Sequence, residues 1–361
     1  MIRPLWDKLV APIDGPLMAI SGLLLLVGLI AMGSASPERI PTFLVHLTIA
    51  FAIMRVVAQV PPPRLMRYAP PLYLLGIALL IAVALFGDIS KGARRWLHLG
   101  FMRVQPSELM KIAMPLMLAW YFHKHESLLR FREYVVATLI LLVPVALILR
   151  QPDLGTSILV FASGFFVIFL AGLPWKVIIG LGATAAAAAP VAWNLLHEYQ
   201  RQRILMLLDP EKDPLGKGFH IIQSTIAIGS GGALGKGWRE GTQSQLDFLP
   251  ERHTDFIFAV WSEEFGLVGN VVLLVLYALL IGRGLQIALN AATTFARLLA
   301  GAITLIFFTY AFVNMGMVSG ILPVVGVPLP FISYGGTALV TLMLGIGILM
   351  SIQKNRMLVH K

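Results

Sequence analysis

Apolar runs of roughly 20 residues recur along the whole chain, and this repetition constrains the fold more than any other feature. A helix of about 20 residues crosses the hydrocarbon core of a bilayer, because each residue adds about 1.5 Å of rise. Mean hydropathy is +0.82 and only 13% of the residues are charged, far fewer than in an average soluble domain. We therefore predict an integral membrane protein.

About ten such runs are long enough to span. They predict an all-α fold, with residues 1–361 forming a single polytopic membrane domain. The first run has no small-residue cleavage motif and is itself long enough to cross, so we expect it to stay as the first helix and not to be removed as a signal. The runs cover residues 16–34, 43–60, 70–87, 107–122, 134–149, 155–173, 176–193, 255–282, 297–319 and 334–352.

The net charge of +10 raises the question of a nucleic-acid partner. Most Lys and Arg residues, however, fall in short connecting segments, and more of these lie on the side of the two termini than on the other side. Positive residues in short loops favour the cytoplasmic face. We therefore predict cytoplasmic termini and no nucleic-acid binding. The absence of cysteine excludes disulfides and a cysteine nucleophile.

One connecting segment, about residues 194–254, is much longer than the others and falls on the predicted extracytoplasmic side. It contains an amphipathic stretch, Tyr199–Leu208, a second apolar stretch, Phe219–Ile228, and a Gly-rich run. A loop of this length and apolar content is neither a plain connector nor a disordered segment, so we expect it to fold back on the membrane surface. Loops of this kind usually carry function.

The Gly-rich run "IGSGGALGKGW" suggests a nucleotide site, but its spacing excludes a P-loop. A P-loop would need glycine at position 230 and serine or threonine at position 237, where this chain has Ser230 and Gly237. Two interpretations remain open. The run is a flexible loop, or its backbone amides and Lys236 form a nest for an anion.

A second outward segment concentrates Lys91, Arg94, Arg95 and Arg103 on the side where positive residues are disfavoured. This exception indicates a bound anion, such as a phosphate or a lipid headgroup. The alternative is that Arg95 and the adjacent Trp96 anchor the chain at the membrane interface.

Two further groups of polar residues lie at or inside predicted spans. Glu108 and Lys111 stand one helical turn apart, which fits either a structural ion pair or a substrate contact. Gln151, Asp153 and Thr156 lie at an outward helix start, where Asp153 is either a capping residue or part of a site.

The segment "NMGMVSGILPVVGVPLPFISYGGTA", residues 314–338, has several Pro and Gly residues inside an apolar region. Irregular backbone at membrane depth is tolerated only where protein buries it or where it lines a cavity, so we predict that this segment forms the wall of a groove. Asp255 is predicted to begin a helix with Thr254 as its cap and Ser262 on nearly the same face. Capping explains an exposed Asp at a helix start, but beside a groove we favour a catalytic or proton-handling role.

The run from Asn314 to Ala338 resembles the signature of the SEDS family, the shape, elongation, division and sporulation proteins. The runs "QPSELMKIA", "QPDLGTS", "YQRQRI", "GKGW" and "GTQSQLDFLPERHTDFIFAV" are also similar to motifs of that family, and the resemblance covers essentially the whole chain. Details such as "LLDPEKDPLG" resemble the elongation branch more than the division or sporulation branches.

This resemblance implies ten transmembrane helices, two cytoplasmic termini and an extracytoplasmic active site in the bacterial inner membrane. It implies a peptidoglycan glycosyltransferase that polymerises lipid II with a class B penicillin-binding protein, a transpeptidase, and with other membrane proteins of the elongation complex. The family's essential aspartate matches Asp255, and its intramembrane Glu and Lys match Glu108 and Lys111. The candidate substrate-binding residues are Lys91, Arg94, Arg95, Gln105, Glu108, Lys111, Gln151, Asp153, Thr156, Gln223, Lys236, Ser262, Ser319 and Ser333.

The mechanism expected from this resemblance is an inverting glycosyl transfer with Asp255 as general base. Positive charge on the basic candidates would stabilise the leaving diphosphate, and the sequence leaves open whether a divalent cation, Mg²⁺ or Mn²⁺, assists. Two alternatives remain. One is a lipid II flippase with a transport path between broken helices, and the other is a non-enzymatic scaffold of the elongation complex.

Overall fold

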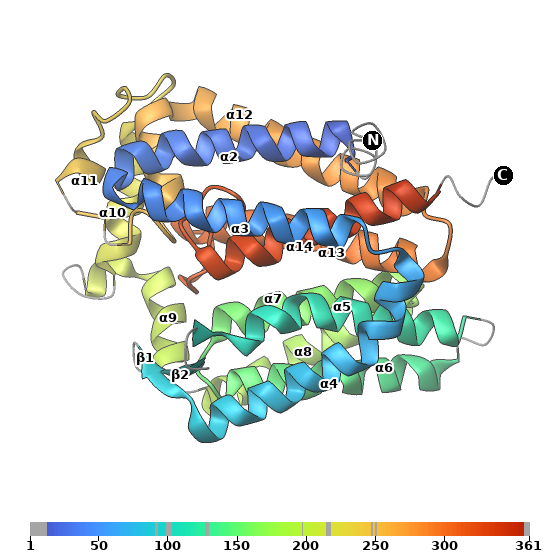
Figure 1. The fold of residues 1–361 in the computed structure, drawn as a ribbon. Coiled ribbons are helices and arrows are strands. Elements are labelled where there is room, and N and C mark those ends of the chain that lie inside the picture. The colour runs from blue at the N-terminus through green and yellow to red at the C-terminus, as the bar shows by residue number, and fades with distance from the viewer. Residues whose placement is uncertain are drawn as a thin grey trace, which may run out of the picture.

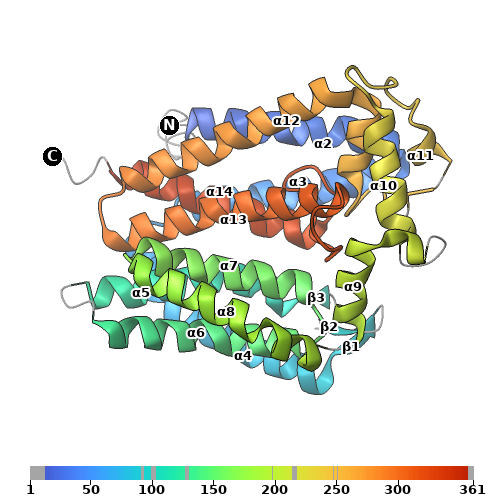
Figure 2. The ribbon, with the colours of Figure 1, turned by 180° about the vertical axis from the view of Figure 1, so that it is seen from behind.

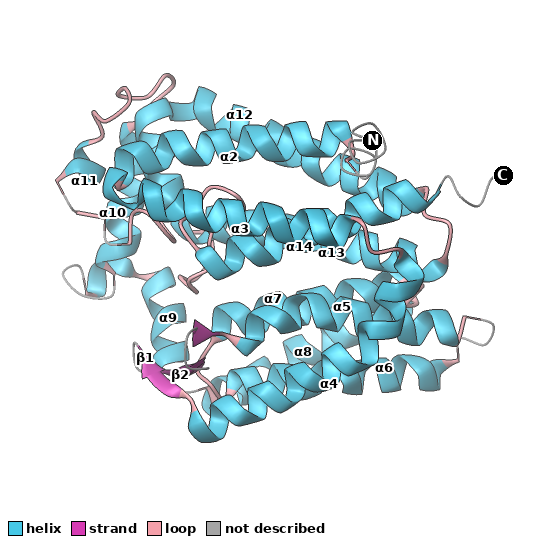
Figure 3. Ribbon diagram, in the orientation of Figure 1, coloured by secondary structure: helices cyan, strands magenta, loops and turns pink. Residues whose placement is uncertain are grey.

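The computed structural model describes residues 13–90, 93–98, 103–126, 130–196, 198–213, 218–246, 248–249 and 251–356. Helices dominate these residues (Figure 3), and every one of the ten predicted runs is a helix. The long helices are α2 Gly15–Ala35, α3 Ile40–Ala58, α4 Pro62–Phe86, α5 Pro106–Lys124, α6 Phe131–Leu149, α7 Leu154–Leu170, α8 Trp175–Leu195, α12 Ile257–Leu289, α13 Thr294–Val318 and α14 Gly336–Asn355.

Within the described residues, seven helices are long and apolar enough to cross a membrane: α2, α3, α4, α6, α12, α13 and α14. The other three differ for identifiable reasons. The α7 helix and the apolar part of α8 are shorter, and α5 carries Glu108 and Lys111 inside its first turns. The prediction of a polytopic all-α membrane protein is confirmed.

The long helices form two groups that lie side by side (Figure 1). One group contains α2, α3, α12, α13 and α14, and the other contains α4 to α8. Within the groups α3 packs on α14, α12 on α13 and α4 on α5, while α13 contacts both α5 and α7 and so joins the two groups. The N- and C-terminal ends lie at the same end of the molecule.

The outward faces of these helices are strongly apolar. Leu74 and Leu85 on α4, Ile179 on α8 and Val268 on α12 are among many large hydrophobic side chains that remain exposed. Apolar surface of this extent is rare on soluble monomers, so it fits helices that contact lipid tails.

The end of the molecule opposite the termini carries the irregular structure (Figures 1 and 2). A small antiparallel sheet of β1 Asp88–Ser90, β2 Ala93–His98 and β3 Arg103–Val104 follows α4. The sequence did not predict this sheet. The long connection after α8 folds into α9 Glu198–Leu208, α10 Phe219–Ser230 and α11 Thr242–Gln245, and α10 packs against α12 and α13.

The Gly-rich run after α10 packs against a break in α12. Gly266 has φ 61° and ψ −155°, so the helical hydrogen bonds stop there. The run supplies the missing partners, because the amides of Lys236 and Gly237 donate to the carbonyls of Glu263 and Glu264 at 3.0 and 3.1 Å. In return, the amides of residues 267 and 268 donate to the carbonyls of residues 232 and 233. These amides are used in bonds to α12. They therefore do not form the anion nest that was one of the two open interpretations of this run.

The side chain of Lys236 also turns inward. Its Nζ lies 2.7 Å from Oε1 of Glu263, a carboxylate with no exposed surface. The amides of Gln243 and Ser244 at α11 donate to the same carboxylate at 3.1 and 3.3 Å. The anion held here is thus one of the chain's own side chains.

Close packing at the break predicts that Gly235→Ala destabilises the protein. A Cβ at Gly235 would lie 2.0 Å from the Glu264 carbonyl oxygen, and the residue has φ +83°. Backbone strain and overpacking should together cost about 2–4 kcal/mol, measured as a lower thermal unfolding midpoint in detergent. The matched control is Gly229→Ala in α10, where a Cβ meets no atom within 4 Å and the midpoint should not fall.

Candidate functional site

A polar cavity of about 350 Å³ opens among the start of α5, the start of α7, strand β2 and the irregular segment between α13 and α14. We call this segment, residues 319–335, the broken segment. The cavity lies between the two helix groups, toward the end that carries the sheet. Its lining consists of Arg95, Trp96, Gln105, Glu108, Lys111, Asp153, Thr156, Leu159, Gly326 and Pro328.

Asp153 organises one side of the cavity. Its Oδ1 accepts a hydrogen bond from the amide of Thr156 at 3.1 Å, so the predicted cap of α7 is confirmed. Its Oδ2 accepts from Gln105 Nε2 at 3.2 Å and lies 3.8 Å from Arg95 Nε. Arg95 also donates to the carbonyl of Pro152 at 2.6 Å. One carboxylate therefore ties the sheet and α5 to the start of α7.

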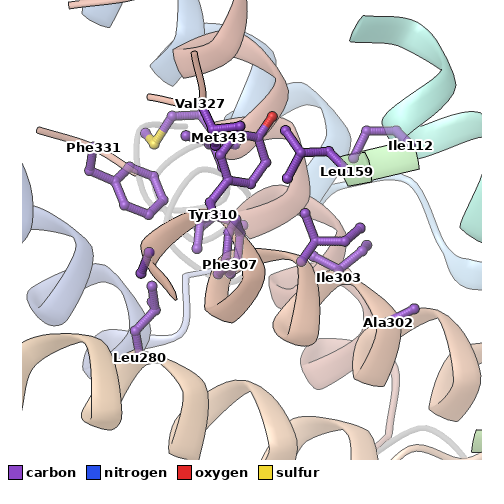
Figure 4. Close-up of a cluster of buried hydrophobic side chains, with 14 of the residues drawn as sticks. Ile112, Leu159, Leu280, Ala302, Ile303, Phe307, Tyr310, Val327, Phe331 and Met343 are labelled. Carbon is purple, nitrogen blue, oxygen red and sulfur yellow. The ribbon is translucent and has the colours of Figure 1, made fainter. Parts of the chain in front are cut away.

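Glu108 and Lys111 form a second polar group in the cavity lining. Lys111 Nζ donates to Glu108 Oε1 at 2.6 Å and to the Tyr310 hydroxyl at 2.7 Å, and Thr341 Oγ1 donates to Glu108 Oε2 at 3.2 Å. Tyr310 belongs to α13, where it stands among Phe307, Leu159 and Val327 (Figure 4), and Thr341 belongs to α14. The ion pair thus joins the two helix groups while both of its members line the cavity.

Asp255 lies beside the same cavity, across the backbone of Gly326. Its Oδ2 is 3.3 Å from the position that a Cβ on Gly326 would take. The predicted local structure of Asp255 was wrong, because α12 begins at Ile257 with Phe256 as its N-cap. Asp255 lies in the preceding turn, and Thr254 Oγ1 donates to Glu251 at 3.1 Å and does not cap the helix.

Hydrogen bonds from the broken segment hold this turn. Ser333 Oγ donates to the carbonyl of Thr254 at 2.6 Å, and the amide of Tyr334 donates to the carbonyl of His253 at 2.8 Å. Burial lowers the pKa of the His253 imidazole below its ordinary value, and the nearby Arg39 guanidinium lowers it further. The imidazole two residues before Asp255 is therefore neutral at pH 7.

Seven of the predicted site residues meet at or beside this cavity. Asp255 lies beside it, next to Gly326. The other six line it: Arg95, Gln105, Glu108, Lys111, Asp153 and Thr156. The prediction that the broken segment forms a groove wall is supported by Gly326 and Pro328, which line the cavity.

Other candidates have structural partners elsewhere. Ser262 has no exposed surface and donates to the Phe258 carbonyl and to Asn270 Oδ1, so it does not share a site with Asp255. Gln151 is buried and donates to the Leu80 carbonyl at 3.1 Å. Ser333 serves the turn described above.

Ser319, Gln223 and Arg94 do not line the cavity either. Ser319 ends α13 and borders a separate apolar pocket between α12 and α13. Gln223 lies in α10, and Arg94 is exposed on β2. Lys91 lies outside the described residues.

Several residues of the site were not predicted. Tyr310 and Thr341 complete the ion-pair network, and Trp96 and Leu159 add apolar wall. The sequence signal available for Tyr310 and Thr341 was that each is a polar residue within an apolar run. Their pairing with α5 is non-local, however, and the sequence does not encode it as a spacing.

The chain resembles known proteins over nearly its full length. The family model described as cell cycle protein, which covers FtsW, RodA and SpoVE, matches residues 17–358. The peptidoglycan glycosyltransferase MrdB of Escherichia coli strain K12 is 53% identical, over 99% of this chain and 98% of that protein. A probable peptidoglycan glycosyltransferase FtsW of Geobacter metallireducens is 38% identical, over 85% of this chain and 83% of that protein.

Solved structures match as well. A chain from a peptidoglycan synthase complex that coordinates polymerization and crosslinking is 36% identical with a TM-score of 0.81, covering 95% of this chain and 98% of that one. The rod shape determining protein RodA of Thermus thermophilus is 30% identical with a TM-score of 0.70, covering 95% and 97%.

The ion pair of the cavity predicts a charge-dependent pattern of stability. Lys111→Met leaves the Glu108 carboxylate without its cation in a site where the side chain is 13% exposed. Removing one partner of a buried pair costs up to about 3–5 kcal/mol, so the thermal unfolding midpoint should fall clearly. Adding Glu108→Gln to the same variant removes the unpaired charge and should recover most of the loss. A double variant no more stable than Lys111→Met would contradict this account.

Proposed function

Because the chain belongs to the cell cycle protein family of FtsW, RodA and SpoVE, we propose that it polymerises lipid II as a peptidoglycan glycosyltransferase with Asp255 as general base. The enzyme class follows from the glycosyltransferase relatives. The role of Asp255 is supported by one observation above all, the place of its carboxylate beside Gly326, a residue that lines the polar cavity.

The composition of the cavity suits a sugar. Two cations, Arg95 and Lys111, face two carboxylates, Asp153 and Glu108, so the formal charges balance. A neutral sugar offers hydroxyl and amide groups that bond to both kinds of side chain without disturbing the ion pairs. Trp96 and Pro328 supply apolar wall for the faces of the ring. We assign this cavity to the sugar portion of a substrate.

The leaving diphosphate needs positive charge that the ion pairs do not already use. Arg94 is exposed on β2, next to Arg95 at the cavity edge. Lys91 precedes it in the sequence. These two residues are our candidates for the diphosphate, with Arg95 and Lys111 contributing from the cavity side. Lys236 drops out of this role, because it is paired with buried Glu263.

The proposed step is a displacement at the anomeric carbon of the donor. The oxygen of the acceptor's 4-hydroxyl forms a bond to C1 of the donor N-acetylmuramic acid, and an oxygen of the Asp255 carboxylate takes the proton of that hydroxyl. The bond between C1 and the diphosphate oxygen breaks, and the polyprenyl diphosphate leaves with the bonding electrons. Attack from the face opposite the leaving group inverts the configuration at C1.

A divalent cation, Mg²⁺ or Mn²⁺, stays a proposal without a defined site. Among the described residues, His, Asp and Glu form no group of three that is arranged to hold a metal. The two cavity carboxylates, Glu108 and Asp153, are already paired with cations. The residues therefore do not fit a protein-held metal, and we derive no step through one.

The proposed orientation puts both termini in the cytoplasm of a bacterial cell, at the inner membrane, and the cavity near the extracytoplasmic face. The polar cavity lies toward the end opposite the termini, which supports this arrangement. We further propose a class B penicillin-binding protein and other elongation-complex membrane proteins as partners, because a matching chain comes from a peptidoglycan synthase complex.

Two rival functions are less well supported. A lipid II flippase would need polar groups along a path between both faces, whereas the polar lining described here gathers toward one end. A scaffold without chemistry would have no use for a polar cavity or for a carboxylate fixed in its wall.

The proposal predicts that Asp255→Asn lowers lipid II polymerisation about 10²- to 10⁴-fold, because general-base assistance contributes a factor of this size. The measurement is glycan chain formation from purified lipid II in detergent, with and without the cognate transpeptidase. Asp209→Asn is the matched control, since Asp209 follows α9 on the same end of the molecule and its carboxylate pairs with exposed Lys212 at 3.2 Å. It should retain wild-type activity.

Full activity of folded Asp255→Asn would rule out the general base. If the wild type and both variants made no polymer even with the partner, and the wild type moved lipid II across liposomes, the flippase would replace the transferase.

A further inference from the structure

We infer that Asn314 is a positioning residue for the general base, because its side-chain amide holds the main chain at Asp255 and at Val327, the neighbour of Gly326. Asn314 lies near the end of α13 and has no exposed surface. This inference rests on the proposed role of Asp255 and adds the element that fixes where its carboxylate stands.

The side-chain amide of Asn314 donates to two main-chain carbonyls. Nδ2 of Asn314 donates to the carbonyl of Asp255 at 2.9 Å and to the carbonyl of Val327 at 2.7 Å. Val327 directly follows Gly326, and Asp255 Oδ2 lies 3.3 Å from the place that a Cβ on Gly326 would take. One planar amide therefore fixes the distance between the turn that contains Asp255 and the part of the broken segment around Gly326.

Neither segment has regular structure that would hold it otherwise. Asp255 lies in the turn before α12, and residues 323–329 have neither helical nor strand structure. Gly326 has φ +73°, a conformation that other residues rarely adopt. On the far side, a Cβ at Gly155 of α7 would lie 2.5 Å from the Val325 carbonyl, so the broken segment is already pressed against α7. From α13, Asn314 holds the same part of the broken segment through its hydrogen bond to the Val327 carbonyl.

The chemistry of the amide supports a specific role. Both partners are carbonyl acceptors, so only the NH₂ end of the amide fits between them. The opposite atom, Oδ1, is buried and has no hydrogen-bond partner among the described atoms. An unsatisfied buried acceptor carries a desolvation cost, so an apolar side chain of similar shape would have avoided that cost. The two donated bonds are the compensating feature, and both go to the segments around Asp255.

A positioning role and a purely structural role predict different kinetics. A residue that only stabilises the fold lowers the unfolding midpoint and leaves kcat unchanged in the protein that remains folded. A residue that orients the base lowers kcat with little change in KM, because substrate binding does not depend on the exact place of the carboxylate.

The experiment compares steady-state polymerisation of purified lipid II, with the cognate transpeptidase present, by wild type, Asn314→Leu and Asn314→Ser. Asn314→Leu keeps the size of the side chain and removes both donors, whereas Asn314→Ser keeps one donor. We expect Asn314→Leu to lower kcat about 10- to 100-fold with KM within about twofold, since small misplacements of a catalytic group cost rates of this order. Asn314→Ser should lie between it and the wild type.

Asn355→Leu is the matched control. Asn355 ends α14 at the opposite end of the molecule, and its Nδ2 donates to the Ser351 carbonyl at 2.7 Å. The substitution removes a comparable amide-to-carbonyl hydrogen bond and should leave kcat and KM unchanged. If Asn314→Leu is not recovered as folded protein, the test uses Asn314→Ser instead. Its kcat should again fall while KM stays nearly unchanged, but the fall in kcat should be smaller.

Asp255→Asn in the same assay separates the two claims. If Asp255→Asn is inactive and folded Asn314→Leu and Asn314→Ser have wild-type kcat, the positioning role is overturned and the proposed base stands. A rise in KM at unchanged kcat in either Asn314 variant would also overturn it. If Asp255→Asn is fully active, the proposed base itself fails, whatever the Asn314 variants do.

Discussion

Polar groups between membrane-spanning helices must be satisfied inside the protein, and the pairing of Lys111 with Glu108 is the interaction on which this structure most depends. The side chains of Lys111 and Glu108 are only 3% and 13% exposed, so each charge must find partners inside the protein, on neighbouring helices as well as on α5. Tyr310 on α13 and Thr341 on α14 provide them. The network makes α5 a partner of the opposite helix group, and it thereby creates the polar cavity at the boundary between the two groups.

The same requirement explains the irregular backbone. Where Gly266 interrupts α12, the Gly-rich run supplies the missing donors and acceptors, and glycines are needed because the two backbones nearly touch. Where the broken segment crosses the cavity wall, Asn314 and Ser333 bond to the turn before α12. Each break in regular structure is thus matched by a defined set of hydrogen bonds. The broken segment and the turn before α12 meet at Asp255, which makes the position of its carboxylate a property of the fold.

The sequence predicts much of this architecture, and the limits have physical causes. Apolar runs locate the ten long helices, because span length is a local property, and Asp153 is identified as a cap by its place before an apolar run. The start of α12 was misplaced by two residues, because Thr254 resembles a cap, yet its hydroxyl bonds to Glu251. The spacing of Glu108 and Lys111 predicts their ion pair. Tyr310, the second partner of Lys111, and Glu263, the partner of Lys236, lie far away in the chain, and no local pattern reveals them.

The central claim is that the Asp255 carboxylate, which lies beside Gly326 at the cavity, takes the proton of the acceptor hydroxyl. The most direct test is a structure of the Asp255→Asn variant, with its cognate transpeptidase and lipid II bound, at a resolution that shows the sugar hydroxyls. The account predicts the acceptor's 4-hydroxyl within about 2.6–3.2 Å of the residue 255 side chain, or one water away from it. A bound acceptor whose 4-hydroxyl instead contacts a different carboxylate, with residue 255 out of reach, would contradict it.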